Sequence, residues 1–281
     1  QWWAGRGLEN TVNYDLKIYP ANPNRSYVAM MDVGLLKSED GGDSFQRMTI
    51  GKRILKPGDD TQGAEIDQAF VVTVDPANGD RILAATGVRP PVDASPEYEY
   101  VSQLLLSTDR GFNWTPMNTP EQHSQITSLL IDGTNIFAGL QARTYNNVYY
   151  PGGIYKSVDY GLHWSKMSFP ADALNQSITS IVMDPKDKNV LYAGVGVSGI
   201  QPDSNGCYGD NLGGVYQSQD AGLSWTKISK ELGNVRTLAI SSKDLNYLYV
   251  GTRSLIDCSK LTPPDAKTYE GGLWYFNFND P

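Results

Sequence analysis

The chain has 281 residues, a length at which one all-β domain is ordinary, so we expect a single domain over residues 1–281. Charged residues make up only 19% of it, and no apolar run approaches the roughly 18 residues of a membrane helix, which excludes direct insertion into a membrane by such a helix. The formal net charge of -8 at pH 7 repels phosphate backbones, which excludes nucleic acid as a partner.

The first element along the chain recurs five times: an apolar run, a turn, and a second apolar run. Where the turn contains Asp-Pro followed by Asn, Gly or Lys, it has the chemistry of a β-hairpin, because Pro presets φ and Asn or Gly accepts positive φ. Each copy therefore predicts two antiparallel strands. The copies are LKIYPANPNRSYVAMMD (16–32), FVVTVDPANGDRILAATG (70–87), ITSLLIDGTNIFAGL (126–140), ITSIVMDPKDKNVLYAGVG (178–196) and VRTLAISSKDLNYLYVGTR (235–253).

A third predicted strand follows each hairpin and in four copies runs into a repeated turn, Ser-x-Asp-x-Gly-x-x-Trp, called here the Ser-Asp-Gly turn. The Asp carboxylate of such a turn can accept backbone N–H groups, the Gly adopts a conformation that a Cβ would forbid, and the Trp packs between sheets. A fourth strand is expected after the Trp. The third strands with their turns are GLLKSEDGGDSF (34–45), QLLLSTDRGFNW (103–114), GIYKSVDYGLHW (153–164) and GVYQSQDAGLSW (214–225), and a fifth strand of this kind, GLWYF (272–276), lacks the turn.

The Ser-Asp-Gly turns specify a fold rather than a catalytic site. Consecutive copies fall on different sheets, so their aspartates are too far apart to act as a carboxylate pair on one bond. We assign a structural role to Ser38, Asp40, Gly42, Phe45, Ser107, Asp109, Gly111, Trp114, Ser157, Asp159, Gly161, Trp164, Ser218, Asp220, Gly222 and Trp225.

Five antiparallel, four-stranded units predict an all-β, five-bladed β-propeller. The blades span roughly 12–50, 66–118, 125–169, 177–229, and 234–281 together with 1–7. The last blade lacks a fourth strand of its own. We therefore expect the N-terminal QWWAGRG (1–7) to complete that blade and close the ring, which would leave no open sheet edge.

The turn pattern resembles the Asp-box (BNR) repeat, whose β-propellers include sialidases, family 74 xyloglucanases, sortilin-type receptors and photosystem assembly factors. Three copies in this chain match the repeat fully, and the first has Phe45 at the aromatic position. The resemblance covers nearly the whole chain and implies the propeller fold. It does not imply one function, because this fold hosts many activities.

Long connections between the second and third strands are the expected place for binding. They span roughly 88–102, 141–152, 196–213 and 253–271, and long loops on a rigid scaffold are where binding residues concentrate. Tyrosine suits both sugar rings and protein surfaces, although tyrosines can also pack such loops against each other. The candidate binding residues are Tyr98, Tyr100, Tyr145, Tyr149, Tyr150, Tyr208, Tyr269, Arg89, Arg143 and Arg253.

The two cysteines bear on the cellular compartment. Cys207 and Cys258 fall in loops of the same type on adjacent blades, so we expect a disulfide between them, with two unrelated buried thiols as the alternative. The chain opens at Gln1 rather than Met, which is typical of a processed protein or of part of a longer one. We expect an extracellular, cell-surface or periplasmic location.

One stretch points to an enzyme. YVAMMDVG (27–34) resembles the opening of family 74 glycosidases, in which an Asp followed by Val or Ile and then Gly is a catalytic carboxylate, and the resemblance implies that role for Asp32. Family 74 sites take a second aspartate from a second propeller, which one five-bladed domain does not supply. Asp32 capping a tight turn is the alternative. A sialidase is less well supported, since VRPP (88–91) is a poor substitute for the Arg-Ile-Pro signature of that family.

These observations favour an extracellular recognition or scaffold propeller that binds a glycan or a protein partner, either free or within a larger surface protein or assembly. A family 74-like glycoside hydrolase that acts on a polysaccharide is the alternative. Only two histidines are present, His123 and His163, and there is no HExxH, GxSxG or clustered Cys/His pattern. We therefore expect neither a metal site nor a cofactor.

Overall fold

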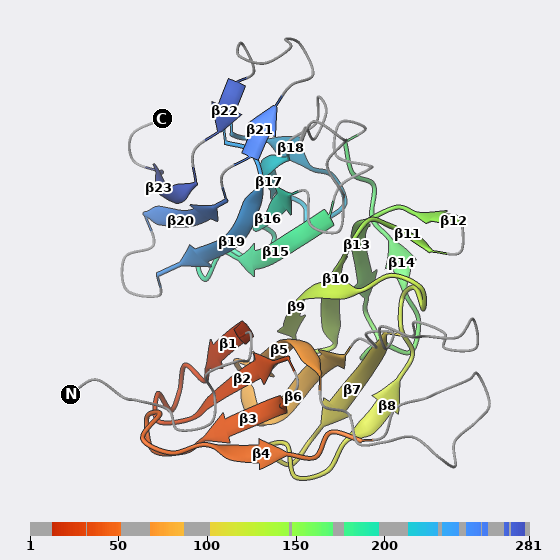
Figure 1. The fold of residues 1–281 in the computed structure, drawn as a ribbon, viewed down its shortest axis with the longest axis vertical. Coiled ribbons are helices and arrows are strands. Elements are labelled where there is room, and N and C mark those ends of the chain that lie inside the picture. The colour runs from red at the N-terminus through yellow and green to blue at the C-terminus, as the bar shows by residue number, and fades with distance from the viewer. Residues whose placement is uncertain are drawn as a thin grey trace. The chain divides into compact units, whose positions relative to one another are not determined.

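A computed structural model gives the fold of the chain (Figure 1). It describes residues 13–31, 33–51, 68–86, 102–145, 148–170, 177–196, 213–229, 232–241, 246–253, 255–257, 267–269 and 271–278. Within these ranges the chain forms strands, turns and irregular connections, and none of the described residues is helical.

Five antiparallel sheets follow one another along the chain, each built mainly from consecutive strands (Figure 1). The first has the order β1 (Asn13–Ile18), β2 (Ser26–Met30), β3 (Gly34–Ser38), β4 (Gln46–Met48). The second has the order β5 (Ala69–Asp75), β6 (Asn78–Thr86), β7 (Gln103–Ser107), β8 (Thr115–Met117). The third has the order β9 (Ile126–Asp132), β10 (Asn135–Leu140), β13 (Gly153–Ser157), β14 (Ser165–Lys166).

The fourth sheet has the order β15 (Ser177–Met183), β16 (Leu191–Gly196), β17 (Gly214–Ser218), β18 (Thr226–Lys227). The fifth contains three described strands, β19 (Val235–Ile240), β20 (Tyr247–Thr252) and β23 (Gly272–Asn277). Two short ribbons lie in the connections between second and third strands. They are β11 (Arg143–Tyr145) with β12 (Val148–Tyr150), and β21 (Leu255–Asp257) with β22 (Lys267–Tyr269).

The predicted fold class is confirmed: the chain is an all-β, five-bladed β-propeller with antiparallel blades. The third strand of every blade begins at the residue that the sequence indicated, and a fourth strand follows each Ser-Asp-Gly turn. The expected closing strand at 1–7 lies outside the described residues and remains a prediction.

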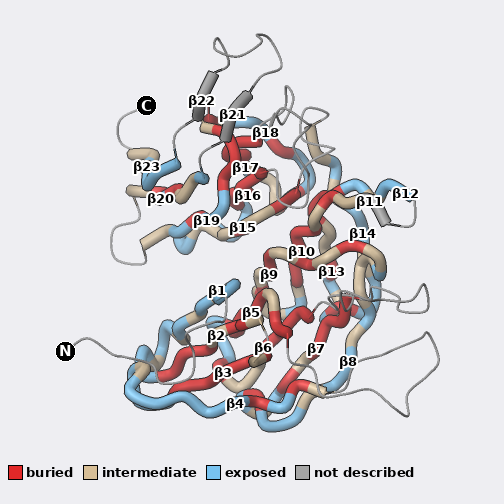
Figure 2. Tube along the Cα trace, viewed as in Figure 1, coloured by how far each residue is buried: buried red, intermediate tan, exposed pale blue. Residues whose placement is uncertain are grey.

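The chain divides into two compact units. Unit 1 contains residues 1–126, 131–135 and 159–162, and unit 2 contains residues 127–130, 136–158 and 163–281. Each unit has apolar clusters of its own that fill the space between successive sheets. In unit 1, Tyr27 and Leu35 of the first sheet pack with Val72 and Val74 of the second, and Figure 2 shows β2 and β3 buried while β1 is largely exposed.

The Asp-Pro hairpins are closed by their own aspartates, whereas the positive φ expected at Asn or Gly is not found at Asn78 or Gly79. Asp75 accepts the amide of Ala77 at 2.9 Å, and Asp184 accepts the amide of Lys186 at 2.7 Å, so each aspartate closes its own turn around the intervening proline. The Asp75 side chain is buried and also pairs with Arg81 at 2.8 Å. These local bonds fix the register of the first and second strands.

Small residues allow neighbouring sheets to approach closely. In the second strand, Gly139 and Gly194 occupy equivalent positions opposite Ile154 and Val215 of the third strand. A Cβ on Gly139 would lie 2.6 Å from Ile178 of the next sheet, and one on Gly194 would lie 2.7 Å from Val235. A larger side chain at either position would therefore force the sheets apart.

First strands are also linked by side-chain hydrogen bonds at β-bulges. The register shifts between Ile178 and Ser180 and again between Val235 and Thr237. Beyond these bulges, Ser128 accepts the amide of Ile181 at 2.8 Å and Ser180 accepts the amide of Leu238 at 3.1 Å. The bulges thus connect one first strand to the next, which periodicity alone did not indicate.

Candidate functional site

Each sheet has two ends with different chemistry. The connections from first to second strand and from third to fourth strand share one end, called here the turn rim, which carries the four Ser-Asp-Gly turns. The connections from second to third strand leave the other end, called here the loop rim. The turn rim repeats closely from sheet to sheet, whereas the loop rim varies in length.

The Ser-Asp-Gly turns satisfy their own polar groups. In the turn at 107–114, Ser107 donates its hydroxyl to Asp109 at 2.8 Å and accepts the amide of Gly111 at 2.7 Å. Asp109 accepts the amide of Asn113 at 2.8 Å and its side-chain nitrogen at 2.6 Å. Trp114 donates its indole N–H to the carbonyl of Gly111 at 2.8 Å, so the same turn holds its aromatic ring against the core.

The turns at 38–45 and 218–225 repeat this geometry. Hydrogen bonds from Ser224 and Ser218 lower the pKa of Asp220 to about 2, and bonds from Ser44 and Ser38 hold the pKa of Asp40 well below its usual range. The backbone and side chain of Asn113 likewise lower the pKa of Asp109. Each carboxylate is therefore held ionised as an acceptor within its turn, which does not suit it to proton transfer near neutral pH.

A strained backbone position accompanies each turn. The residue before the glycine has a positive φ, which is 66° at Arg110, 58° at Tyr160 and 56° at Ala221, while the first turn places Gly41 there at 80°. The amide of this residue donates to the hairpin turn of the same sheet, for example from Arg110 to Asp80 at 3.0 Å and from Ala221 to Asn189 at 2.9 Å. This bond offsets the cost of the left-handed conformation in a non-glycine residue.

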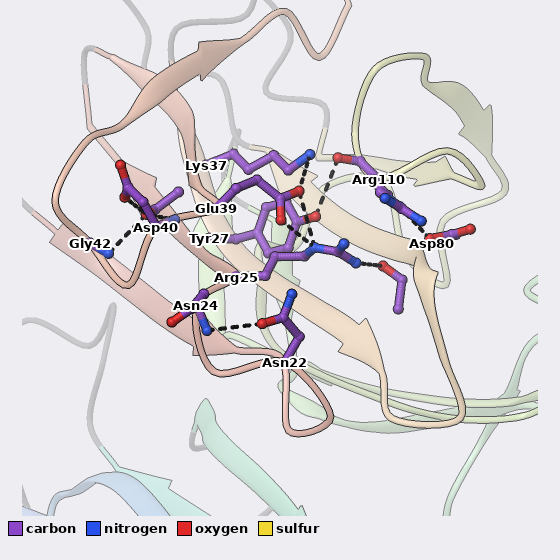
Figure 3. Close-up of polar contacts among 12 residues, drawn as sticks. Asn22, Asn24, Arg25, Tyr27, Lys37, Glu39, Asp40, Gly42, Asp80 and Arg110 are labelled. Carbon is purple, nitrogen blue, oxygen red and sulfur yellow. Dashed lines mark hydrogen bonds and ion pairs between the residues drawn. The ribbon is translucent and has the colours of Figure 1, made fainter.

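Buried cations join the first sheet to the second at the turn rim (Figure 3). Arg25 and Lys37 have nearly buried side chains, and both pair with Glu39, at 3.0 and 2.8 Å. Arg25 also donates to the carbonyl of Gly79 in the second sheet at 3.1 Å. Burial acts to raise the pKa of Glu39, but hydrogen bonds from Lys37 and Arg25 outweigh burial and lower it. Both cations are thus held by one structural carboxylate, that of Glu39.

Tyr27 extends the same contact to the next turn. Its hydroxyl donates to the carbonyl of Arg110 at 3.3 Å, and the Arg110 side chain pairs with Asp80 at 2.6 Å (Figure 3). Burial raises the pKa of the Tyr27 phenol above its ordinary value. Comparable contacts recur, because Arg81 lies over the Tyr160 ring at 4.7 Å and Lys156 donates to the carbonyl of Ala221 at 3.1 Å. The charged residues of the turn rim therefore act as links between sheets.

The loop rim carries an exposed β-ribbon, β11–β12, between β10 and β13 of the third sheet. Its register pairs Arg143 with Tyr150, Thr144 with Tyr149 and Tyr145 with Val148. Val148 is 51% exposed and Tyr149 is 47% exposed, and partial burial raises the pKa of the Tyr149 phenol. Because β10 and β13 are themselves paired along five residues, the ribbon stands on a rigid base.

The structure brings three candidate binding residues together on this ribbon: Arg143, Tyr149 and Tyr150. For Tyr145 and Tyr269 the structure describes only the backbone, which lies in strands β11 and β22. Arg253 follows β20 and is exposed, and its amide and carbonyl bond to Asn234 at 3.2 and 3.3 Å. The remaining predicted positions lie outside the described residues and are Asp32, Arg89, Tyr98, Tyr100, Cys207, Tyr208 and Cys258.

Sequence reasoning missed the ribbon, although a signal for it exists. The stretch RTYNNVYY (143–150) places Asn-Asn between two short β-forming triplets, which is a two-residue hairpin pattern. It also missed the links made by buried cations, for which Lys37 and Lys156 directly before a turn Ser would have been a clue.

Two further findings concern the part of the chain that the structure describes. Across these residues, no group of three or more His, Cys, Asp or Glu side chains is arranged to hold a metal ion. In the same residues there is no helix long and apolar enough to span a membrane.

No protein-family model and no curated protein matches the sequence. Solved structures do match. A GH74 xyloglucanase from Xanthomonas campestris is 20% identical with a TM-score of 0.61, over 96% of this chain and 38% of that one. A GH74 enzyme from Niastella koreensis is 16% identical with a TM-score of 0.61, over 95% and 36%. YCF48 from Cyanidioschyzon merolae is 14% identical with a TM-score of 0.50, over 94% and 71%.

These likenesses support the propeller fold. This chain spans less than two fifths of either GH74 enzyme, at 38% and 36% of their lengths. It shares the fold with enzymes and with YCF48, so the comparison does not choose between catalysis and binding.

Proposed function

We propose that this protein is an extracellular recognition propeller that binds a glycan or a protein partner at its loop rim, and that its turns are of the Asp-box type. The observation that carries the proposal is the β11–β12 ribbon, which presents Val148 and Tyr149 to solvent at 51% and 47% exposure on a paired base. Because successive side chains of a strand point to opposite faces, the ribbon exposes Val148 on one face and Tyr149 on the other, and such exposed apolar groups suit an apolar sugar face or a protein surface.

The contrast between the rims supports the same proposal. On the turn rim the carboxylates and cations described above are engaged in turn closure and in links between sheets. Removing one of those groups would destabilise the fold, so the turn rim cannot easily change its side chains to bind a partner. The ribbon can change without breaking the links between sheets, which is the usual division between scaffold and binding loop.

The proposal is tested with an array of polysaccharides and extracellular proteins probed with the labelled full chain. We expect a hit that is lost in the double variant Val148→Ser, Tyr149→Ser. The matched control is Phe112→Ser, Leu223→Ser, which removes two somewhat more exposed apolar side chains, at 63% and 66%, from the turn rim. Binding that depends on the control residues and not on the ribbon would contradict the proposal.

A second candidate function is glycoside hydrolysis with Asp32 as a catalytic carboxylate. It is favoured by chain order, because Asp32 comes between Met30 of β2 and Gly34 of β3, which pair with each other. The test is release of reducing sugar from polysaccharides. Release that Asp32→Asn abolishes would establish the enzyme, and binding without release would leave the recognition proposal in place.

A further inference from the structure

One hairpin turn of unit 1 combines an exposed asparagine with a following glycine. Asn78 is the first residue of β6 and is exposed, and Gly79 comes next in the chain. Of the asparagines that the structure describes, Asn78 alone is followed by glycine, while a second such pair, Asn205 with Gly206, lies outside the described residues. Glycine has no Cβ, so the backbone nitrogen that follows Asn78 is less shielded than it would be before any other residue.

The strand register leaves the backbone irregular at this pair. Asn78 pairs with Asp75, and the next register pair joins Ile82 to Val74, so residues 79–81 fall in the register shift between the two pairs. A bulged segment of this kind lies outside the regular ladder. A change in the backbone at this point therefore does not require that paired residues separate first.

The side chain of Asn78 is held against the backbone that follows it. Its Oδ1 accepts the amide of Asp80 at 3.1 Å, and this Asx-turn brings the side-chain carbonyl carbon toward the intervening nitrogen of Gly79. A backbone N–H that donates to a carbonyl oxygen also stabilises negative charge that develops on that oxygen. The turn thus favours attack of the Gly79 nitrogen on Cγ of Asn78.

The first-to-second-strand turn of the first sheet has the same hydrogen bond without the nucleophile. Oδ1 of Asn22 accepts the amide of Asn24 at 3.2 Å. The intervening residue is Pro23, whose nitrogen carries no proton to lose. Asn22 is therefore an internal control, with the same side chain and the same kind of turn but no nitrogen that can attack.

We propose that Asn78 is a site of spontaneous deamidation. The backbone nitrogen of Gly79 loses its proton to solvent, attacks Cγ of Asn78 and displaces the side-chain nitrogen, which leaves as ammonia. The product is a cyclic succinimide. Water then opens the ring at either carbonyl and gives aspartate or isoaspartate at position 78. Water is consumed and ammonia is released, and the side chain changes from neutral to negatively charged.

Deamidation weakens the link between the first two sheets. The carbonyl of Gly79 accepts the side chain of Arg25 at 3.1 Å, and the carbonyl of Asp80 accepts the amide of Arg110 at 3.0 Å. Isoaspartate adds a carbon to the main chain directly before Gly79, which displaces both carbonyls. Its carboxylate also adds like charge beside Asp80, whose side chain pairs with Arg110 at 2.6 Å (Figure 3).

The test is peptide mapping by mass spectrometry of the folded full chain after storage in mildly alkaline buffer, with an isoaspartyl methyltransferase assay for isoaspartate. We expect the peptide that contains Asn78 to gain the mass of an amide-to-acid exchange, and to do so faster at higher pH, because the attacking nitrogen must lose a proton. The peptide that contains Asn22 should remain unchanged. An Asn78 that stays unmodified in the folded chain would overturn the proposal, and so would equal modification of Asn22.

The effect on the link between sheets is measured on the separated product. The deamidated chain carries an additional negative charge, so anion exchange isolates it, and we expect a lower melting temperature than that of the unmodified chain. Asn78→Gln is the control, because its longer side chain forms the ring far less readily. Its melting temperature should not fall during storage, and comparison before and after storage cancels any cost of the substitution itself. A deamidated chain that melts like the unmodified one would contradict the claimed effect, as would an equal loss on storage in Asn78→Gln.

Discussion

The two rims of the sheets are built from the same strands but use their side chains differently. On the turn rim, a serine, an aspartate and a glycine recur at fixed spacing, and their bonds have nearly equal lengths in separate sheets, such as 2.8 Å for Ser107 to Asp109 and for Ser218 to Asp220. On the loop rim, the third sheet carries a ribbon with exposed side chains at Val148 and Tyr149. Repetition marks the parts that hold the sheets, and variation marks the parts at which we propose binding.

The largest expected effect is on stability, and it should differ between Trp225 and Phe45, which occupy the same position of the turn in two sheets. Trp225→Ala should lower the free energy of unfolding by about 3–5 kcal/mol, because the ring is buried among Phe137, Ile181 and Tyr216. Phe45→Ala should cost about 0.5 kcal/mol or less, because Phe45 is 43% exposed. Urea denaturation measures both, and equal costs would show that the aromatic position is not what secures the turn.

Removing the hydroxyl of a turn serine should lower the free energy of unfolding by a smaller amount. Ser218→Ala deletes the acceptor for the amide of Gly222 and the donor to Asp220, at a site where the serine is 1% exposed, so we expect a loss of about 1–3 kcal/mol. Ser165→Ala, at an exposed position of β14, is the control and should be close to neutral. If Ser218→Ala and Ser165→Ala had the same melting temperature, the hydrogen bonds of Ser218 would contribute nothing to stability.

Acid should weaken the turn rim. The pKa values of Asp40, Asp109 and Asp220 are lowered in the folded state, so the stability they contribute is present above their ordinary pKa and is lost as the pH falls through the folded value. We expect the free energy of unfolding to fall between about pH 4 and pH 2. Asp220→Asn should be less stable at pH 7 and should show a shallower acid dependence. An unchanged slope would show that this carboxylate titrates normally.

The smallest effect on stability should come from the loop rim. Tyr149→Ser should change the free energy of unfolding by about 0.5 kcal/mol or less, because the side chain is 47% exposed. Its effect should instead be on binding to a partner found by the array. A large loss of stability in this variant would mean that the ribbon is part of the scaffold, which would remove the distinction between the rims.

The fold was open to prediction because its signals are local and repeated. The Asp-Pro turns, the apolar third strands and the Ser-Asp-Gly turns each specify their own backbone, and their spacing gave the number of sheets. The bulges at Ser180 and Thr237 and the cation links of Arg25 and Lys156 were not predicted, because they depend on partners in the next sheet. Sequence spacing does not report which side chain a neighbouring sheet presents.

The candidate site was predictable only in outline. Chain order placed the long connections on one rim, and RTYNNVYY (143–150) contained the hairpin signal for the ribbon. The exposure of Val148 and Tyr149 was hidden from the sequence, because β-forming residues such as Val and Tyr occur on buried and exposed strands alike. A residue type shows what a position can bury, whereas exposure shows whether anything covers it.

The most direct test of the central claim is to replace the ribbon, residues 143–150, by a short Gly-Ser turn and to titrate the product with the partner found by the array. The account predicts a protein that melts close to the wild type and no longer binds. A replacement that binds with unchanged affinity would contradict the claim that recognition resides on the loop rim, and one that no longer folds would contradict the claim that this rim is dispensable for stability.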